Sequence, residues 1–161
     1  MQTPQQSSRL ISLDVFRGLT IAGMILVNNP GTWSSIYPAL KHAEWHGWTP
    51  TDFIFPFFLF IVGVAMTLSF KKRLEKGDSK KDLLIHVIKR SLIIFALGMF
   101  LHLFPYFNFS TVRIPGVLQR IAVVYLIASL IYLYTSFRMQ MIISIVILIL
   151  YWLAALGRAV R

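Results

Sequence analysis

Long apolar runs alternate with short polar segments along the chain, and this pattern predicts five membrane-spanning helices. The runs cover about residues 13–29, 53–70, 83–104, 117–135 and 139–156. Each run has roughly the 17 to 25 residues that a helix needs to cross the hydrocarbon core of a bilayer. The runs are too long for the strands of a membrane barrel, and they do not alternate between polar and apolar residues. The predicted fold class is therefore all-α, a polytopic membrane bundle of about five transmembrane helices.

The composition agrees with a membrane protein. Hydrophobic residues make up 57% of the chain and charged residues only 14%, whereas soluble domains are about 45–50% apolar and about 25% charged. The net charge of +10 does not indicate a nucleic-acid partner, because eight of the sixteen Lys and Arg residues lie between Lys71 and Arg90, beside apolar runs. The chain has no cysteine, which excludes disulfides and thiolate metal sites.

The distribution of basic residues between the loops predicts the orientation in the membrane. Residues 71–82 contain six Lys or Arg, whereas Lys41 is the one basic residue of segment 30–52. By the positive-inside rule, segment 71–82 is cytoplasmic and segment 30–52 is extracytoplasmic. Residues 1–12 then form a cytoplasmic N-terminal segment, with no cleaved signal peptide, ahead of a transmembrane domain over 13–161. Arg158 and Arg161 would lie outside, against the rule, which suggests a truncated chain.

The segment KHAEWHGWTPTD, residues 41–52, places titratable and aromatic side chains between two predicted spans. His42 and His46 are four residues apart, a spacing that can bind zinc on a helix, but nearby prolines disfavour a helix and no third ligand is evident. We therefore expect no metal. A single imidazole can act as a general base near neutral pH. The alternative is that His42 only forms hydrogen bonds in an interfacial aromatic belt with Trp45 and Trp48.

Asp52 stands at the predicted start of the second span. A carboxylate at this position usually caps the helix, favoured by the helix dipole. It could also reach His42 and fix the tautomer of the imidazole, as an orienting carboxylate does in catalytic triads.

The first span carries a polar face formed by Asp14, Arg17 and Asn28. This face could line an internal cavity. Alternatively, Asp14 and Arg17 form an ion pair near the headgroups, and Asn28 caps the end of the helix. Asn29, Pro30 and the glycine after it could end the helix without Asn28.

The segment RIPGVLQR, residues 113–120, precedes and enters the fourth span. Arg113 is expected outside the membrane, whereas Gln119 and Arg120 lie in the first turns of the span. Arg120 needs a partner in the bundle, such as Asp52 or a bound anion, or it extends to the outer interface. His86 and His102 lie on apolar faces and are expected to be packed or interfacial.

Three strings together resemble a known family: SLDVFRGLTIAGMILVN, KHAEWHGWTPTDFIFPFFLFIVG and RIPGVLQRIAVVY. They resemble the heparan-alpha-glucosaminide N-acetyltransferase family of transmembrane acyltransferases, specifically its bacterial members, over about residues 9–125. The resemblance implies transfer of an acetyl group from cytosolic acetyl-CoA to an extracytoplasmic amino sugar, in the inner membrane. It also implies that His42, in Lys41-His42-Ala43, is catalytic and that Asn28 participates. His46 does not match the histidine of the family.

The resemblance further implies that this chain is the N-terminal half of a larger bundle, because family members have roughly ten or eleven spans. Such a chain is expected to be inactive unless it assembles with another copy or with the missing half. Cations at the cytoplasmic face would be needed for the phosphates of CoA, and Arg17, Lys89 and Arg90 are candidates.

The function expected from the sequence is therefore an acetyl-CoA-dependent N- or O-acyltransferase that acts on an extracytoplasmic sugar. His42 is the general base or the acyl carrier, and the amide of Asn28 binds the thioester carbonyl. Asp52, Gln119, Arg120 and Arg113 are supporting residues. The alternatives are a non-catalytic transporter or assembly subunit, whose polar stripe lines a permeation path, and an inactive fragment.

Overall fold

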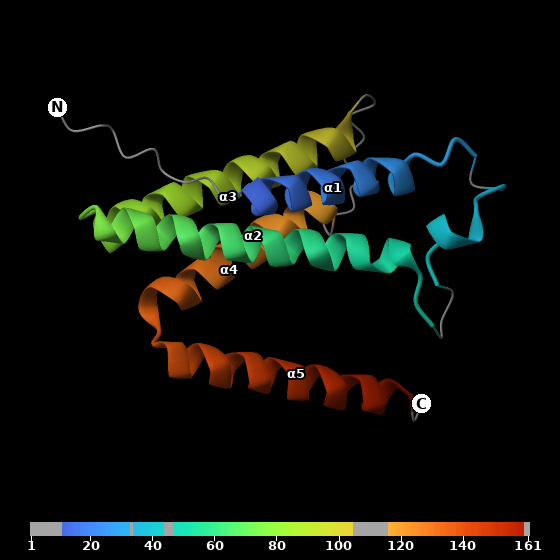
Figure 1. The fold of residues 1–161 in the computed structure, drawn as a ribbon. Helices are drawn as coiled ribbons and strands as arrows, with labels where there is room; N and C mark the ends of the chain where they lie inside the picture. The colour runs from blue at the N-terminus through green and yellow to red at the C-terminus, as the bar shows by residue number, and fades with distance from the viewer. Residues whose placement is uncertain (1–10, 33, 44–46, 105–115, 160–161) are drawn as a thin grey trace. The chain divides into compact units, whose positions relative to one another are not determined.

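The computed structural model describes residues 11–32, 34–43, 47–104 and 116–159. Within these ranges every regular element is a helix, and no strand is present (Figure 1). The helices are α1 (Ile11–Asn28), the 3-10 helix η1 (Pro38–Leu40), α2 (Pro50–Glu75), α3 (Lys80–Leu103), α4 (Val117–Tyr134) and α5 (Phe137–Ala159). All five α-helices are long and apolar enough to cross a membrane. The predicted all-α membrane fold is confirmed.

The helix boundaries differ from the predicted spans chiefly at α2. This helix begins at Pro50 and ends at Glu75, whereas its apolar run covers about residues 53–70. Hydropathy follows the membrane and not the helix, so the polar first turn and the charged last turn were excluded from the predicted span. The extra first turn contains Asp52, which places this carboxylate inside the helix.

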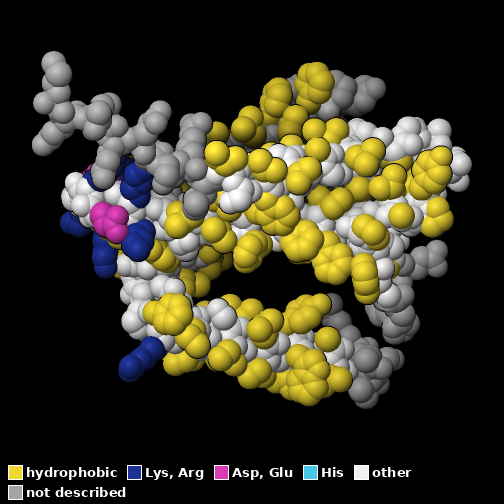
Figure 2. Space-filling view, in the orientation of Figure 1, with side chains coloured by type: hydrophobic (Ala, Val, Ile, Leu, Met, Phe, Trp, Pro, Cys, Tyr) yellow, Lys and Arg dark blue, Asp and Glu magenta, His cyan; other side chains and the backbone are white. Residues whose placement is uncertain are grey.

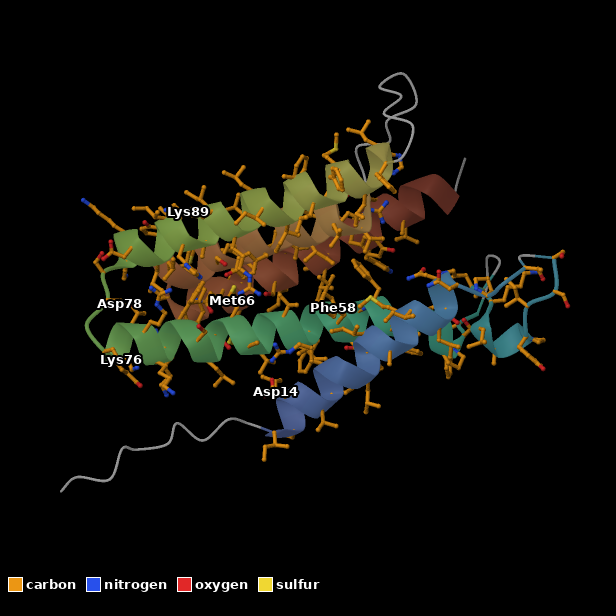
Figure 3. The ribbon with its side chains drawn as sticks, turned by 90° about the horizontal axis from the view of Figure 1, so that it is seen from above. Asp14, Phe58, Met66, Lys76, Asp78 and Lys89 are labelled. Carbon is orange, nitrogen blue, oxygen red and sulfur yellow. The ribbon has the colours of Figure 1, made fainter. Side chains whose placement is uncertain are left out.

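The chain divides into two compact units, residues 1–69 and residues 70–161, with the boundary inside α2. In the first unit, α1 lies beside the first part of α2 and runs in the opposite direction (Figure 3). The rings of Phe16 and Phe57 are 5.7 Å apart. Near the other end of the contact, a Cβ added to Gly23 would lie 3.3 Å from Cδ1 of Ile54. A glycine therefore permits close approach of α1 to α2.

In the second unit, α3 packs against α4. The two helices approach closely at Gly98, where an added Cβ would lie 2.9 Å from Cβ of Leu118. About two turns earlier in α3, the guanidinium carbon of Arg90 lies 5.3 Å from the centre of the Tyr125 ring. The residue order along the two helices shows that they are antiparallel.

Helix α5 exposes its apolar residues all round, and none of the residues in its apolar window is buried. Figure 2 shows hydrophobic side chains along its visible face. A 23-residue apolar helix with no buried side is typical of a helix surrounded by lipid or by other membrane helices.

A tight turn joins α2 to α3. Gly77 has a φ of +94°, a left-handed conformation that favours glycine. Nε of Arg73 donates to Asp78 at 2.7 Å, and the Oγ of Ser79 accepts from the backbone N–H of Asp82 at 3.1 Å to cap α3. Lys and Arg side chains gather at this turn (Figure 2).

Candidate functional site

His42 and Asp52 form a direct hydrogen bond, with 2.6 Å between Nδ1 of the imidazole and Oδ1 of the carboxylate. His42 lies two residues after η1, and Asp52 lies in the first turn of α2. The His42 side chain is 68% exposed. Because a carboxylate accepts, Nδ1 donates, and in the neutral ring Nε2 then carries the lone pair. The suggestion that Asp52 reaches His42 agrees with this geometry.

The second oxygen of Asp52 is held by Thr49 and Ala43. Oδ2 accepts from the backbone N–H of Thr49 at 2.9 Å and from its hydroxyl at 3.0 Å. The backbone N–H of Ala43 donates to the same oxygen at 3.4 Å. The contacts with Thr49 are a capping-box arrangement, in which the third residue of a helix binds back to the residue before the helix. Asp52 therefore caps α2 and binds His42 with different oxygens.

A second contact ties the histidine-bearing loop to α2. The hydroxyl of Thr51 donates to the carbonyl of Ala39 in η1 at 3.2 Å, and Thr51 is only 3% exposed. The ring of Trp48 packs edge-on against Phe53, with 5.1 Å between centroids. Trp48 is thus an exposed aromatic residue beside the site, as an interfacial belt requires. His46 and Trp45 lie outside the described residues.

Asn28 is the last residue of α1, and its side chain is exposed. The next residue, Asn29, caps the C-terminal end of α1, because its Nδ2 donates to the backbone carbonyl of Ile25 at 2.8 Å. Gly31 follows with a φ of +75°. No hydrogen bond joins Asn28 to His42 within the described part of the chain. Because Asn29 supplies the amide that caps α1, the cap does not require the amide of Asn28.

Asp14 and Arg17 form an ion pair one turn apart, with 2.6 Å between Nη2 and Oδ1. Both side chains are about half exposed. This geometry agrees with the interpretation of a surface ion pair at the start of α1, and such pairs contribute about 0–1 kcal/mol. The hydroxyl of Thr20 donates to the backbone carbonyl of Arg17 at 2.9 Å.

Gln119 is buried in the first turn of α4, with 4% of its surface exposed. Its carboxamide lies against two glycines: a Cβ on Gly98 would lie 2.8 Å from Oε1, and one on Gly116 would overlap the same oxygen. Nε2 has no hydrogen-bond partner among the described residues. The burial of Gln119 depends on contact between α3 and α4, so its position in the sequence did not reveal it.

The other candidate basic residues lie at separate positions along α3 and α4 or outside the described residues. Lys89 and Arg90 are exposed on α3, and Arg90 stacks over Tyr125. Arg120 is exposed on α4, and its suggested pairing with Asp52 would join the two units and stays a prediction. Arg113 lies outside the described residues. Among the described residues there is no group of three or more His, Asp or Glu that could hold a metal ion.

Thr49 and Thr51 are the residues that the sequence analysis did not assign to the site. A signal was present, because Thr49-Pro50-Thr51-Asp52 has the spacing of a capping box with proline in the first helical position. The spacing does not show that the capping carboxylate also binds a histidine ten residues earlier.

The five apolar helices and the polar site between α1 and α2 define a multi-pass membrane protein with titratable groups at a helix start. The chain belongs to the heparan-alpha-glucosaminide N-acetyltransferase family, whose catalytic-region model matches residues 9–158. This confirms the family resemblance in the sequence and identifies a transmembrane acetyltransferase family.

Two relatives support the assignment. The chain is 36% identical to mouse heparan-alpha-glucosaminide N-acetyltransferase over 127 residues, which cover 76% of this chain and 19% of the mouse protein. It is 38% identical to the human protein of the same name over 125 residues, which cover 75% of this chain and 18% of the human protein. The matched part therefore spans about a fifth of the length of these relatives.

Proposed function

We propose that this chain contributes to transfer of an acetyl group from cytosolic acetyl-CoA to an amine or hydroxyl of a sugar on the other side of the membrane. Family membership supports the acetyl transfer. The single observation that carries the role of His42 is its 2.6 Å hydrogen bond to Asp52. Because the matched region is about a fifth of the length of the relatives, the proposal includes assembly with a second copy or with a further part of the enzyme.

In the proposed reaction, Nε2 of His42 is the general base. Asp52 accepts a hydrogen bond from the Nδ1–H group, so the Nε2 lone pair is available, and the exposed ring can meet a substrate. Nε2 takes a proton from the acceptor as its nitrogen or oxygen bonds to the thioester carbonyl carbon. The carbon–sulfur bond then breaks, and CoA leaves as the thiolate. Alternatively, Nε2 attacks the carbonyl and CoA leaves as the thiolate. The acetyl group then passes from Nε2 to the acceptor, and the departing imidazole takes the acceptor's proton. Asp52 stabilises the imidazolium in the first route and orients the ring in both.

Asn28 is proposed to donate a hydrogen bond from its side-chain amide to the thioester carbonyl as negative charge develops on the oxygen. Such a donor contributes about 3 to 4 kcal/mol to the transition state. Two observations support the role: the amide is exposed, and the adjacent Asn29 already caps α1. A polar side chain that capping does not require is available for substrate.

Cytoplasmic cations are proposed to bind the phosphates of CoA. Lys89 and Arg90 are exposed on α3 (Figure 3 labels Lys89). Arg17 is the weaker candidate, because its guanidinium already pairs with Asp14. The same proposal puts residues 30–52 on the extracytoplasmic side of the inner membrane, so that His42 faces the sugar acceptor.

The experiment is an acetyl-transfer assay on the purified protein in lipid nanodiscs, with radiolabelled acetyl-CoA and glucosamine. His42→Ala is expected to abolish transfer. His86→Ala is the matched control, because His86 is an exposed histidine on α3 outside the site. Full activity of the His42→Ala protein would contradict the assignment. A transporter would instead move solute without consuming the thioester, and absence of transfer by the wild-type protein would refute activity of this chain alone.

A further inference from the structure

The side-chain hydroxyl of Thr49 donates a hydrogen bond to a carboxylate oxygen of Asp52. Its Oγ1 lies 3.0 Å from Oδ2, and its own backbone N–H lies 2.9 Å from the same atom. The backbone N–H of Asp52 donates to the carbonyl of Thr49 and not to its hydroxyl. The hydroxyl is therefore not the acceptor that caps the helix.

The start of α3 provides a direct comparison within the same chain. Ser79 and Asp82 have the same three-residue spacing as Thr49 and Asp52. There, the serine oxygen accepts from the backbone N–H of Asp82 at 3.1 Å, as an ordinary N-cap does, and its hydroxyl also donates to Oδ2 of Asp82 at 2.7 Å. In both helix starts the hydroxyl donates to the carboxylate of the aspartate, and the Ser79 oxygen additionally accepts from a backbone N–H.

Because Thr49 donates twice to Oδ2 while Oδ1 of the same carboxylate binds His42, we infer that Thr49 is a positioning residue for His42, acting through Asp52. Two donors from Thr49 fix Oδ2, and a carboxylate is planar, so fixing one oxygen together with the side-chain rotamer directs Oδ1 toward Nδ1 of His42. Without the hydroxyl, Oδ2 keeps the backbone N–H of Thr49 and the longer contact from Ala43, and the carboxylate can rotate away from the imidazole. This inference rests on the proposed role of His42 for its effect on catalysis, but its structural part does not.

The tautomer of His42 is the readout, because a purely structural role of Thr49 would not change it. The chain contains four histidines, so ¹⁵N-histidine labelling gives few signals, and His42→Gln identifies those of His42. The two neutral tautomers are compared in spectra of the full chain in nanodiscs at alkaline pH. In the wild-type protein we expect the Nδ1–H form to dominate, because Asp52 accepts a hydrogen bond from this group.

Three variants test the inference. Thr49→Val removes the hydroxyl with little change in shape, and we expect the ratio of Nδ1–H to Nε2–H to fall about fivefold, the effect of losing one hydrogen bond of about 1 kcal/mol. Thr49→Ser keeps the hydroxyl and should restore the wild-type ratio. Ser79→Ala weakens the cap of α3 by a comparable amount and should leave His42 unchanged. In the acetyl-transfer assay, Thr49→Val should lower kcat with little change in KM.

Asp52→Asn separates the possible failures. If Thr49→Val leaves the tautomer ratio unchanged while Asp52→Asn alters it, Thr49 is not a positioning residue, although the His42–Asp52 pair stands. If Ser79→Ala changes the ratio as much as Thr49→Val does, the effect is general destabilisation and the inference is wrong. If Thr49→Val changes the ratio but His42→Ala keeps full transfer activity, the positioning holds and the proposed function of His42 fails.

Discussion

The neighbouring residues Asn28 and Asn29 show how two identical side chains at the end of α1 differ in their structural roles. Nδ2 of Asn29 binds the carbonyl of Ile25, whereas the Asn28 side chain is exposed. A helix end leaves its last carbonyls without intrahelical partners, and a side-chain amide can satisfy one of them. The stability of α1 and the proposed chemistry therefore depend on different asparagines.

Exchanging each asparagine for alanine should separate these roles. Asn28→Ala is expected to lower kcat of acetyl transfer by about 10²- to 10³-fold, as loss of an oxyanion donor does, with an unchanged thermal unfolding midpoint. Asn29→Ala is expected to reduce stability by about 1 kcal/mol, the net contribution of one hydrogen bond, and to retain most activity. The measurements are the transfer assay and thermal unfolding of the detergent-solubilised protein. Equal loss of activity in both variants would contradict a specific role for Asn28.

For individual residues, the sequence indicated which side chains belong to the candidate site, but it did not indicate which atoms they contact. His42 and Asp52 could be named because titratable groups are rare beside apolar spans. Their hydrogen bond depends on the path of the nine residues between them, which hydropathy does not encode. The burial of Gln119 was missed for the same reason, because it depends on the close approach of α3 at Gly98.

Among the helices, α3 approaches α4 closely at Gly98. A Cβ there would lie 2.8 Å from the carboxamide oxygen of Gln119 and 2.9 Å from Cβ of Leu118. The end of a glutamine side chain can move, but a Cβ is fixed to its backbone. An added methyl group must therefore separate the two helices.

Gly98→Ala is accordingly expected to destabilise the protein by about 1 to 3 kcal/mol, the usual cost of overpacking. Gly18→Ala, in the exposed interior of α1 with nothing within 4 Å of an added Cβ, should be neutral or stabilising by up to about 1 kcal/mol, because alanine favours helix. Thermal unfolding followed by size-exclusion chromatography measures both effects. A stable Gly98→Ala protein would show that α3 and α4 do not approach so closely.

The hydrogen bond from the Thr51 hydroxyl to the carbonyl of Ala39 holds the loop that carries His42 against α2, and its loss should be detectable by hydrogen–deuterium exchange. Thr51→Val removes the hydrogen bond to the carbonyl of Ala39 and should loosen η1 against the start of α2. We expect faster hydrogen–deuterium exchange at the backbone N–H groups of Leu40 and Lys41, which donate within the η1 turn. Exchange in α3, in the other unit, is the internal control, and unchanged exchange in η1 would show that Thr51 does not anchor the loop.

The helices themselves were predictable from the sequence, because a continuous apolar run about 18 residues long has few alternatives in a membrane. Their ends were less predictable. The last turn of α2 contains Lys72 and Arg73, and cations are favoured at a helix C-terminus although hydropathy excludes them. The polar first turn with Asp52 was excluded from the span for the same reason.

For the whole molecule, the orientation in the membrane is the property that decides whether the proposed chemistry is possible. The absence of native cysteine allows single introduced cysteines to be labelled without background. A cysteine at Ser35 is expected to react with an impermeant thiol reagent added to intact cells, and one at Lys76 only after permeabilisation. Both positions are exposed. The reverse pattern would place His42 on the cytoplasmic side and exclude transfer to an extracytoplasmic sugar by this residue.

Family and fold class could be inferred from three sequence strings and from hydropathy, and both are confirmed. The surroundings of α5 could not be predicted, because an apolar helix has the same composition whether it faces lipid or other helices. The structure shows its residues exposed within this chain.

The carboxylate of Asp52 has a consequence for how this region can vary between related proteins. One oxygen of this carboxylate caps the N-terminus of α2, and the other orients His42. Position 52 is therefore pleiotropic, because a substitution there alters both folding and chemistry. Asp82 occupies the equivalent position at the start of α3, and no histidine contact there is found among the described residues, so it can drift as long as the helix remains capped. Sequence variation among homologues should thus differ between two positions that have the same local structure.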